Sequence, residues 1–221
     1  DGEFPSDLFV NVTNTGDGGN LTIETKRLIA KDGGQIKALT FGNGNAGNVT
    51  VKASEFIDLD GFVLVNDEIF PSGLFTKVER GGKGNAGNLT VETGKLTVVN
   101  GAQIASTARN ASKGGELNIN ATDSILVSGS APNATLLSGR SGIFVSADPS
   151  YTDALGELVP TTGDSGNLLI NTGKLTVEEG GTVIADTFGT GKAGELTLNV
   201  SELVIRNGGL VRTGSLVEEG A

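Results

Sequence analysis

A short motif recurs along this 221-residue chain at regular intervals, and it constrains the fold more than any other feature. The motif reads Gly-Asn-Leu-Thr-Val with small variations, and its copies begin at Gly19, Gly47, Gly87, Gly115, Gly166 and Gly194. Counted in residues, the successive intervals are 28, 40, 28, 51 and 28. The base unit is therefore a 28-residue repeat, and the two longer intervals mark units that carry insertions. Periods of this size are typical of repeat architectures.

Each unit contains three short segments in which apolar and polar residues alternate. In residues 87–114 the segments are marked by Leu89 and Val91, by Leu96 and Val98, and by Ile104. Such alternation predicts β-strands that each have one buried face. No segment shows the sustained period of a helix.

Strands this short cannot bury their apolar face within one unit, so each unit must stack on its neighbours. We therefore predict an all-β fold, a right-handed parallel β-helix (a solenoid) with three strands per 28-residue coil and about six to seven coils. Residues 1–221 are expected to form a single β-helix segment of a longer protein.

Glycine is abundant, with 35 residues, and one Gly recurs at the same offset in every unit. A chain that turns corners needs positive φ, which Gly adopts at little steric cost. The recurring residues are Gly33, Gly61, Gly101, Gly129, Gly180 and Gly208. An Asn also recurs at one position, as Asn20, Asn48, Asn88 and Asn167. Stacked Asn side chains can form a hydrogen-bonded ladder, or Asn can simply suit a turn, and the sequence leaves both open.

The insertions fall at residues 62–72, 130–140 and 147–164. The first two occupy the same corner of alternate units, so we expect them to project from one edge about 10 Å apart. The first is apolar, with Phe62–Val65 followed by Ile69 and Phe70. This composition predicts a strand that covers the flank of the β-helix, or an adhesive patch. Insertions on one face of a solenoid are usual sites of binding.

Composition excludes several chemistries. The chain has no His and no Cys, which removes the Ser-His-Asp triad, thiol nucleophiles and His/Cys zinc or haem sites. A net charge of −10 disfavours nucleic acid and anionic membrane surfaces as partners, and no apolar run is long enough to cross a membrane. We therefore expect no enzymatic activity, no cofactor and no resident metal.

Polar and aromatic residues of the insertions are the candidate binding surface. They are Asn66, Asp67, Glu68, Phe70, Asp148, Tyr151 and Asp153. Several carry oxygen ligands suited to Ca²⁺, although their spacing matches no EF-hand loop. Asp58 and Asp60, two positions apart on one predicted strand, form either a glycosidase-like pair or part of a solvated face.

The strand phrases Gly-Asn-Leu-Thr-Val, Gly-Lys-Leu-Thr-Val and Gly-Ala-Gln-Ile-Ala-Ser, all within residues 87–106, resemble the repeats of filamentous-haemagglutinin-like exoproteins of cyanobacterial style. The resemblance covers residues 6–213 and lies in repeat style rather than in a catalytic motif. It implies a large extracellular or cell-surface β-helix exported by two-partner secretion through an outer-membrane partner.

The resemblance implies an adhesin, matrix or filament component. The expected partners are cell-surface or matrix glycans or other surface proteins, and end-to-end self-association is a further possibility. Two alternatives remain open. One is a carbohydrate-active β-helix enzyme, and the other is a glycan-binding module that acts through the inserted loops.

Overall fold

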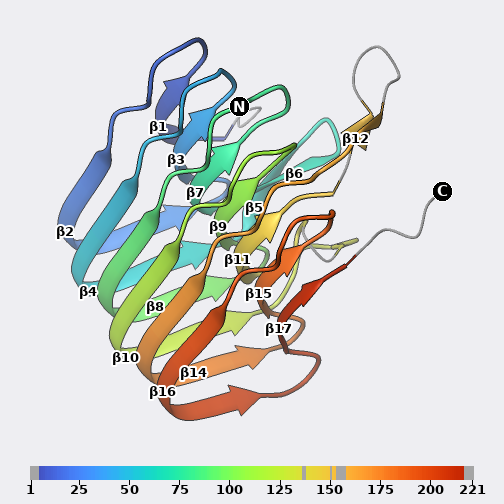
Figure 1. Ribbon diagram of the computed structural model, residues 1–221. Helices are drawn as coiled ribbons and strands as arrows, with labels where there is room; N and C mark the ends of the chain where they lie inside the picture. Colours follow the sequence, from blue (N-terminus) through green and yellow to red (C-terminus); the bar gives the residue numbers. More distant parts are fainter. Residues whose placement is uncertain (1–4, 136–137, 150, 153–157, 217–221) are drawn as a thin grey trace.

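Two parallel β-sheets stacked from successive strands make up most of the molecule (Figure 1). The computed structural model describes residues 5–135, 138–149, 151–152 and 158–216. The first sheet contains β1 (Asp7–Val12), β3 (Gln35–Thr40), β7 (Gly73–Val78), β9 (Gln103–Ala108), β11 (Gly142–Ala147), β15 (Thr182–Thr187) and β17 (Leu210–Ser215), in that order. The second contains β2 (Leu21–Lys31), β4 (Val49–Asp60), β8 (Leu89–Val99), β10 (Leu117–Ser128), β14 (Leu168–Glu178) and β16 (Leu196–Ile205), in that order.

Two short antiparallel pairs complete the fold. They are β5 (Phe62–Val65) with β6 (Glu68–Pro71), and β12 (Tyr151–Thr152) with β13 (Leu158–Val159). The described residues contain no helix that is long and apolar enough to cross a membrane. The chain is thus all-β over its described part, as the alternation predicts.

Equivalent residues of successive repeats lie directly beside one another in the sheets. Leu21 pairs with Val49, Val49 with Leu89, and Leu89 with Leu117, all in parallel register. The intervals between these partners along the chain are the same as those between the corresponding motifs. Residues that are equivalent in the sequence repeats are therefore hydrogen-bonding partners in neighbouring strands. This arrangement is compatible with a parallel β-helix.

The structure differs from the prediction of three strands per repeat. The first two predicted strands form one long strand that bends without leaving the sheet. In β4 the bend is a bulge, because Ser54 and Glu55 together oppose the single residue Gly94 of β8. Each repeat therefore contributes one long and one short strand.

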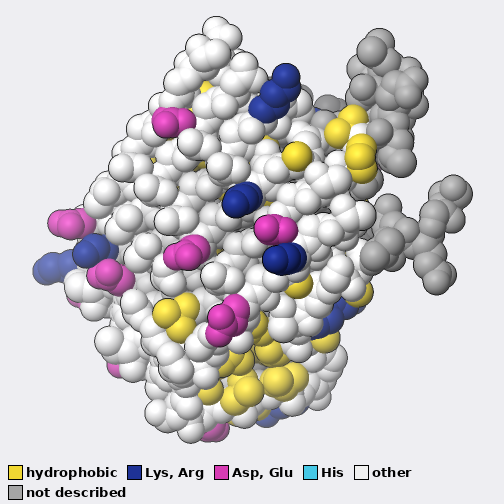
Figure 2. All heavy atoms as spheres, viewed as in Figure 1, with side chains coloured by type: hydrophobic (Ala, Val, Ile, Leu, Met, Phe, Trp, Pro, Cys, Tyr) yellow, Lys and Arg dark blue, Asp and Glu magenta, His cyan; other side chains and the backbone are white. Residues whose placement is uncertain are grey.

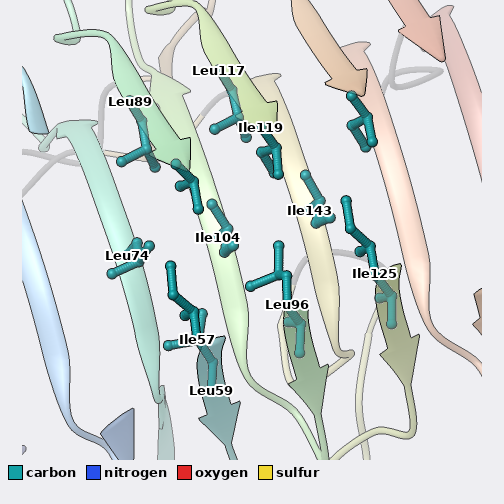
Figure 3. Close-up of a cluster of buried hydrophobic side chains, with 14 of the residues drawn as sticks. Ile57, Leu59, Leu74, Leu89, Leu96, Ile104, Leu117, Ile119, Ile125 and Ile143 are labelled. Carbon is teal, nitrogen blue, oxygen red and sulfur yellow. The ribbon is translucent and has the colours of Figure 1, made fainter. Parts of the chain in front are cut away.

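The core fills the space between the two sheets with columns of aliphatic side chains (Figure 3). Each inner repeat supplies four such side chains from its long strand and others from its short strand. In one repeat these include Val49, Val51, Ile57 and Leu59 from β4 and Leu74 from β7, all fully buried. Full burial of such a side chain is worth roughly 1.5–3 kcal/mol.

One prediction from the alternation is wrong. Strands β9, β11 and β15 are buried on both faces, whereas each strand was expected to have one solvated face. Phe144 and Ile184 point away from the core and form a second, smaller apolar cluster with Ala105. The physical reason is that the outward side chains of these strands are apolar and pack against one another across neighbouring repeats.

The corner glycines adopt the backbone conformation that the sequence predicts. All six have positive φ, between 76° and 96°. In the repeats without an insertion at this corner, the residue before the Gly also has positive φ, as at Asp32, Asn100 and Asn207. Two consecutive left-handed residues make the tight turn between the long and the short strand.

The recurring Asn residues form a ladder, but not between amides. The side-chain oxygen of Asn20 accepts the backbone N–H of Asn48 at 3.0 Å, and that of Asn48 accepts the N–H of Asn88 at 2.8 Å. Asn88 in turn accepts the N–H of Glu116. A second column three residues earlier, which the sequence analysis missed, begins with Asp17 and Asn45 in the same way. In both columns, a side-chain oxygen of one repeat accepts a backbone N–H of the next repeat.

The two end repeats expose side chains that other repeats bury. Leu21, Ile23 and Leu28 at one end are only partly buried, as are Leu196 and Leu198 at the other. Figure 2 shows hydrophobic side chains gathered at the end formed by β16 and β17. The outer backbone edges of β2 and β16 also lack a neighbouring strand in the sheet.

From the second copy of the motif onwards, the glycine that opens it lies against the backbone of the preceding repeat. A Cβ added at Gly87 would lie 2.0 Å from the carbonyl oxygen of Gly47, and one at Gly115 would lie 1.9 Å from that of Gly87. No side chain fits at these distances without moving backbone, which explains why Gly recurs there.

Gly87→Ala should therefore lower the free energy of unfolding by about 1–3 kcal/mol, measured by urea denaturation. Gly19→Ala is the matched control, because Gly19 begins the same column and a Cβ there meets nothing within 4 Å. The control should change stability by less than about 1 kcal/mol. Equal effects at both positions would contradict the close-approach explanation.

Candidate functional site

The first insertion is a β-hairpin that lies against the corners of its neighbours. In its antiparallel register Phe62 pairs with Pro71 and Val65 with Glu68. The side chain of Val63 packs on Gly33 of the preceding repeat, where a Cβ would lie 2.4 Å from its Cγ1. This agrees with the predicted strand that covers the flank.

The first two insertions lie side by side. A Cβ at Gly139 would be 2.9 Å from Cδ1 of Ile69, so the second insertion contacts the hairpin directly. Ser130 and Arg140 form an isolated antiparallel bridge at the base of the second insertion. The two insertions thus form one wall beside the points where the short strands β7 and β11 of the seven-stranded sheet begin.

Both insertions are fastened by the same pair of hydrogen bonds. The Gln35 side-chain amide donates to the Pro71 carbonyl at 2.9 Å, and the Gln103 amide donates to the Arg140 carbonyl at 3.1 Å. A Ser stands where the chain returns to the sheet from each insertion, and its hydroxyl accepts a corner N–H. Ser72 accepts from Gly33 at 3.0 Å, and Ser141 accepts from Gly101 at 2.8 Å.

The phrase Ser-Gly-Leu/Ile-Phe resumes each short strand after an insertion, and the structure explains its Gly and Phe. A Cβ at Gly73 would lie 2.9 Å from the ring of Phe75, and one at Gly142 would lie 2.0 Å from the ring of Phe144. Each ring therefore folds back over its own glycine on the outer face of the sheet.

A groove of about 780 Å³ lies between this wall and the outer face of the sheet. Its floor is made of outward side chains of β3, β7, β9 and β11, and one wall is residues 68–71 with 138–139. Residues at the far ends of the same short strands form the opposite wall. The floor side chains are Gln35, Lys37, Leu39, Phe75, Lys77, Gln103, Ala105, Thr107, Phe144 and Ser146.

Three cations that line the groove form ion pairs. Lys37 Nζ lies 2.7 Å from Asp7 Oδ2, and Lys77 Nζ lies 3.4 Å from Glu79 Oε1. A guanidinium nitrogen of Arg109 lies 3.1 Å from Asp148 Oδ2. These carboxylates are held by cations and do not converge on a common point.

Three of the predicted site residues lie on the groove. They are Glu68, Phe70 and Asp148. Asn66 and Asp67 lie instead at the exposed tip of the hairpin, where their φ angles of 50° and 65° form its tight turn. The backbone of Tyr151 pairs with Val159, and Asp153 lies outside the described residues.

The sequence analysis missed most of the groove floor. Lys37, Phe75, Lys77 and Arg109 come from three different repeats and are ordinary polar or aromatic residues in isolation. The available signal was their shared place at outward positions of the short strand, which appears when the repeats are aligned.

The paired aspartates of β4 do face the same side, as their spacing predicts. The ammonium of Lys31 lies 3.2 Å from Asp58 Oδ2 and 3.3 Å from Asp60 Oδ2. Asp58 contributes most to raising the pKa of Lys31 above its ordinary value. Asp60 also accepts a hydrogen bond from Asn100. Within the described part of the chain, no three acidic side chains gather closely enough to hold a metal ion.

A buried ion pair lies beyond the groove on the outer face of the same sheet. Asp186 is fully buried, and its Oδ2 accepts a hydrogen bond from Nε of Arg212 at 2.9 Å. Burial raises the pKa of the Asp186 carboxyl above its ordinary value, and Arg212 opposes part of that rise.

Comparison of the chain with known protein families, with curated proteins and with solved structures found no match.

The raised pKa of Asp186 predicts a pH-dependent stability. Because the folded state holds the Asp186 proton more tightly than the unfolded state, acidification from pH 7 towards the ordinary Asp pKa of about 4 favours the folded state at this residue. As the pH falls over this range, the free energy of unfolding of the wild type should therefore increase relative to that of Asp186→Asn. Urea denaturation of both proteins at pH 7, 5.5 and 4 measures the difference, and a constant difference would contradict the prediction.

Proposed function

We propose that this chain is a right-handed parallel β-helix in which each 28-residue repeat forms one coil of three segments, the first two joined at a bend. The parallel pairing of equivalent residues supports this reading. Right-handedness follows from the strong general preference for right-handed crossovers between parallel strands.

The function that we propose is that of an extracellular structural or adhesive segment of a secreted surface protein. Support comes from the repetitive stack and from the resemblance of its repeats to filamentous-haemagglutinin-like exoproteins. Export by two-partner secretion, with an outer-membrane partner for the whole protein, belongs to the same proposal. Surface or matrix glycans and other surface proteins are the proposed partners.

The observation that carries the proposal is the groove under the insertions. Its walls are held by repeated hydrogen bonds, and its cations Lys37, Lys77 and Arg109 are each paired with a carboxylate. A pre-formed lining of neutralised charges suits binding, whereas catalysis of glycoside cleavage commonly needs two carboxylates on either side of one bond.

End-to-end association of two copies has a geometric requirement. If β17 of one copy paired with β1 of the next, the first sheet would continue. The second sheet has one strand fewer, so a strand position would stay empty between β16 and β2. Association of this kind therefore needs an additional segment that fills the position.

Surface display is the direct test of the proposed role. Antibodies raised against residues 1–221 should label intact cells of the source organism as strongly as permeabilised cells. Antibodies against a cytoplasmic protein are the control and should label only permeabilised cells. Labelling of the chain that requires permeabilisation would overturn the extracellular assignment.

The alternative of a carbohydrate-active enzyme has a separate test. We expect residues 1–221 to release no reducing ends from neutral or acidic polysaccharides beyond a buffer control. Release that Glu68→Gln or Asp148→Asn abolishes would establish the enzyme instead, because these carboxylates line the groove.

A further inference from the structure

We propose that the groove binds a neutral, linear oligosaccharide or polysaccharide chain that lies along the stacking direction of the strands. The inference rests on the proposed adhesive role and names the class of its ligand. It follows from the shape, the aromatic lining and the hydrogen-bonding groups of the groove.

The shape suits an extended chain. The groove crosses β3, β7, β9 and β11, and parallel strands are spaced about 4.8 Å apart, so its floor extends roughly 14 Å along the stack. Residues of β6 border it along one side, where Figure 1 shows this hairpin beside the sheet. Such a trough admits several units of a linear polymer.

Aromatic side chains line the groove on more than one side. Phe75 lies on the floor, Phe70 on the hairpin wall and Phe41 at the opposite end of β3. Phe41 is 44% exposed, and the other two are half-buried. Ala105 lies between Phe75 and Phe144 in the register, so a small residue separates two rings. Flat aromatic rings are suited to pack against the C–H faces of sugar rings.

The polar groups of the groove match hydroxyl groups better than charges. A sugar hydroxyl both donates and accepts, so it can bridge an ion pair such as Arg109 with Asp148 without separating it. Thr107, only 8% exposed on the floor, has a hydroxyl oxygen with no hydrogen-bond partner among the described residues, and Nε of Arg109 is also unpartnered. Buried polar atoms without a partner are uncommon in folded proteins, and of those in the described part of the chain these two belong to residues that line the groove.

Other polymers fit less well. The floor is the face of a sheet whose backbone groups are paired with neighbouring strands, so a peptide cannot add to it as another strand. Polyanions such as nucleic acids or acidic glycans meet a chain of net charge −10 and cations already neutralised by carboxylates.

The test is calorimetric titration of residues 1–221 with neutral gluco-, manno-, xylo- and galacto-oligosaccharides of six units, and with oligogalacturonate as the acidic probe. We expect at least one neutral probe to bind, and Phe41→Ala to weaken it about tenfold, as for the loss of one anchoring aromatic. Phe9→Ala is the matched control. Phe9 is 54% exposed and pairs with Lys37 in the same sheet, but it lies outside the groove, so its loss should leave affinity unchanged.

Thr107→Val separates binding from folding. Valine keeps the shape of threonine and removes the unpartnered hydroxyl, so the free energy of unfolding should stay the same or increase, while affinity falls several-fold. A structural role alone would not lower affinity and preserve stability together.

Several results would overturn the proposal. These are no binding of any neutral probe, tighter binding of oligogalacturonate, or affinity that Phe41→Ala and Phe9→Ala change equally. The antibody experiment separates this failure from that of the proposed role. Labelled intact cells without glycan binding would refute only the groove ligand, and binding without surface labelling would refute only the extracellular role.

Discussion

The parallel hydrogen bonding of each strand to its equivalent in the next repeat is the interaction on which the rest of the structure depends. Because Leu21, Val49 and Leu89 are direct partners, every other position of the repeat also lies over its own copy. A conformation that suits one repeat therefore recurs at equivalent positions of the others, apart from the insertions and bulges. The close approach of Gly47 and Gly87, and the acceptance of each N–H by the preceding Asn20 or Asn48, follow from this one constraint.

In alternate repeats the same constraint builds the groove. A chain segment added at one corner must return to the sheet in register, and Ser72 and Ser141 mark that return by accepting a corner N–H from the preceding repeat. Since the insertions leave from the same corner, the hairpin and the second insertion meet at Ile69 and Gly139. The groove is thus a consequence of insertion at the same corner of alternate repeats.

The sequence predicts the parts of this fold that repeat and misses the parts that depend on contacts between repeats. The strand positions, the positive φ at Gly33 and Gly101, and the presence of a strand in the first insertion follow from spacing and composition. The continuous bent strand does not, because a bulge at Ser54 and an interruption look alike in an alternation pattern. Of the candidate site, Glu68, Phe70 and Asp148 were found because they lie in or beside insertions. Lys37, Phe75 and Thr107 were not, since only the sheet brings them together.

One column of outward side chains crosses the outer face of the seven-stranded sheet, from β1 to β17. Along one outward column the residues are Phe9, Lys37, Phe75, Ala105, Phe144, Ile184 and Arg212. At the far end of this face Arg212 forms an ion pair with the buried Asp186. At Thr107 and Arg109 no such internal partner is provided for every buried polar atom. The Asn20 and Asp17 columns satisfy backbone N–H groups of successive repeats, whereas Thr107 and Arg109, which line the groove, each retain a buried side-chain atom without a partner among the described residues.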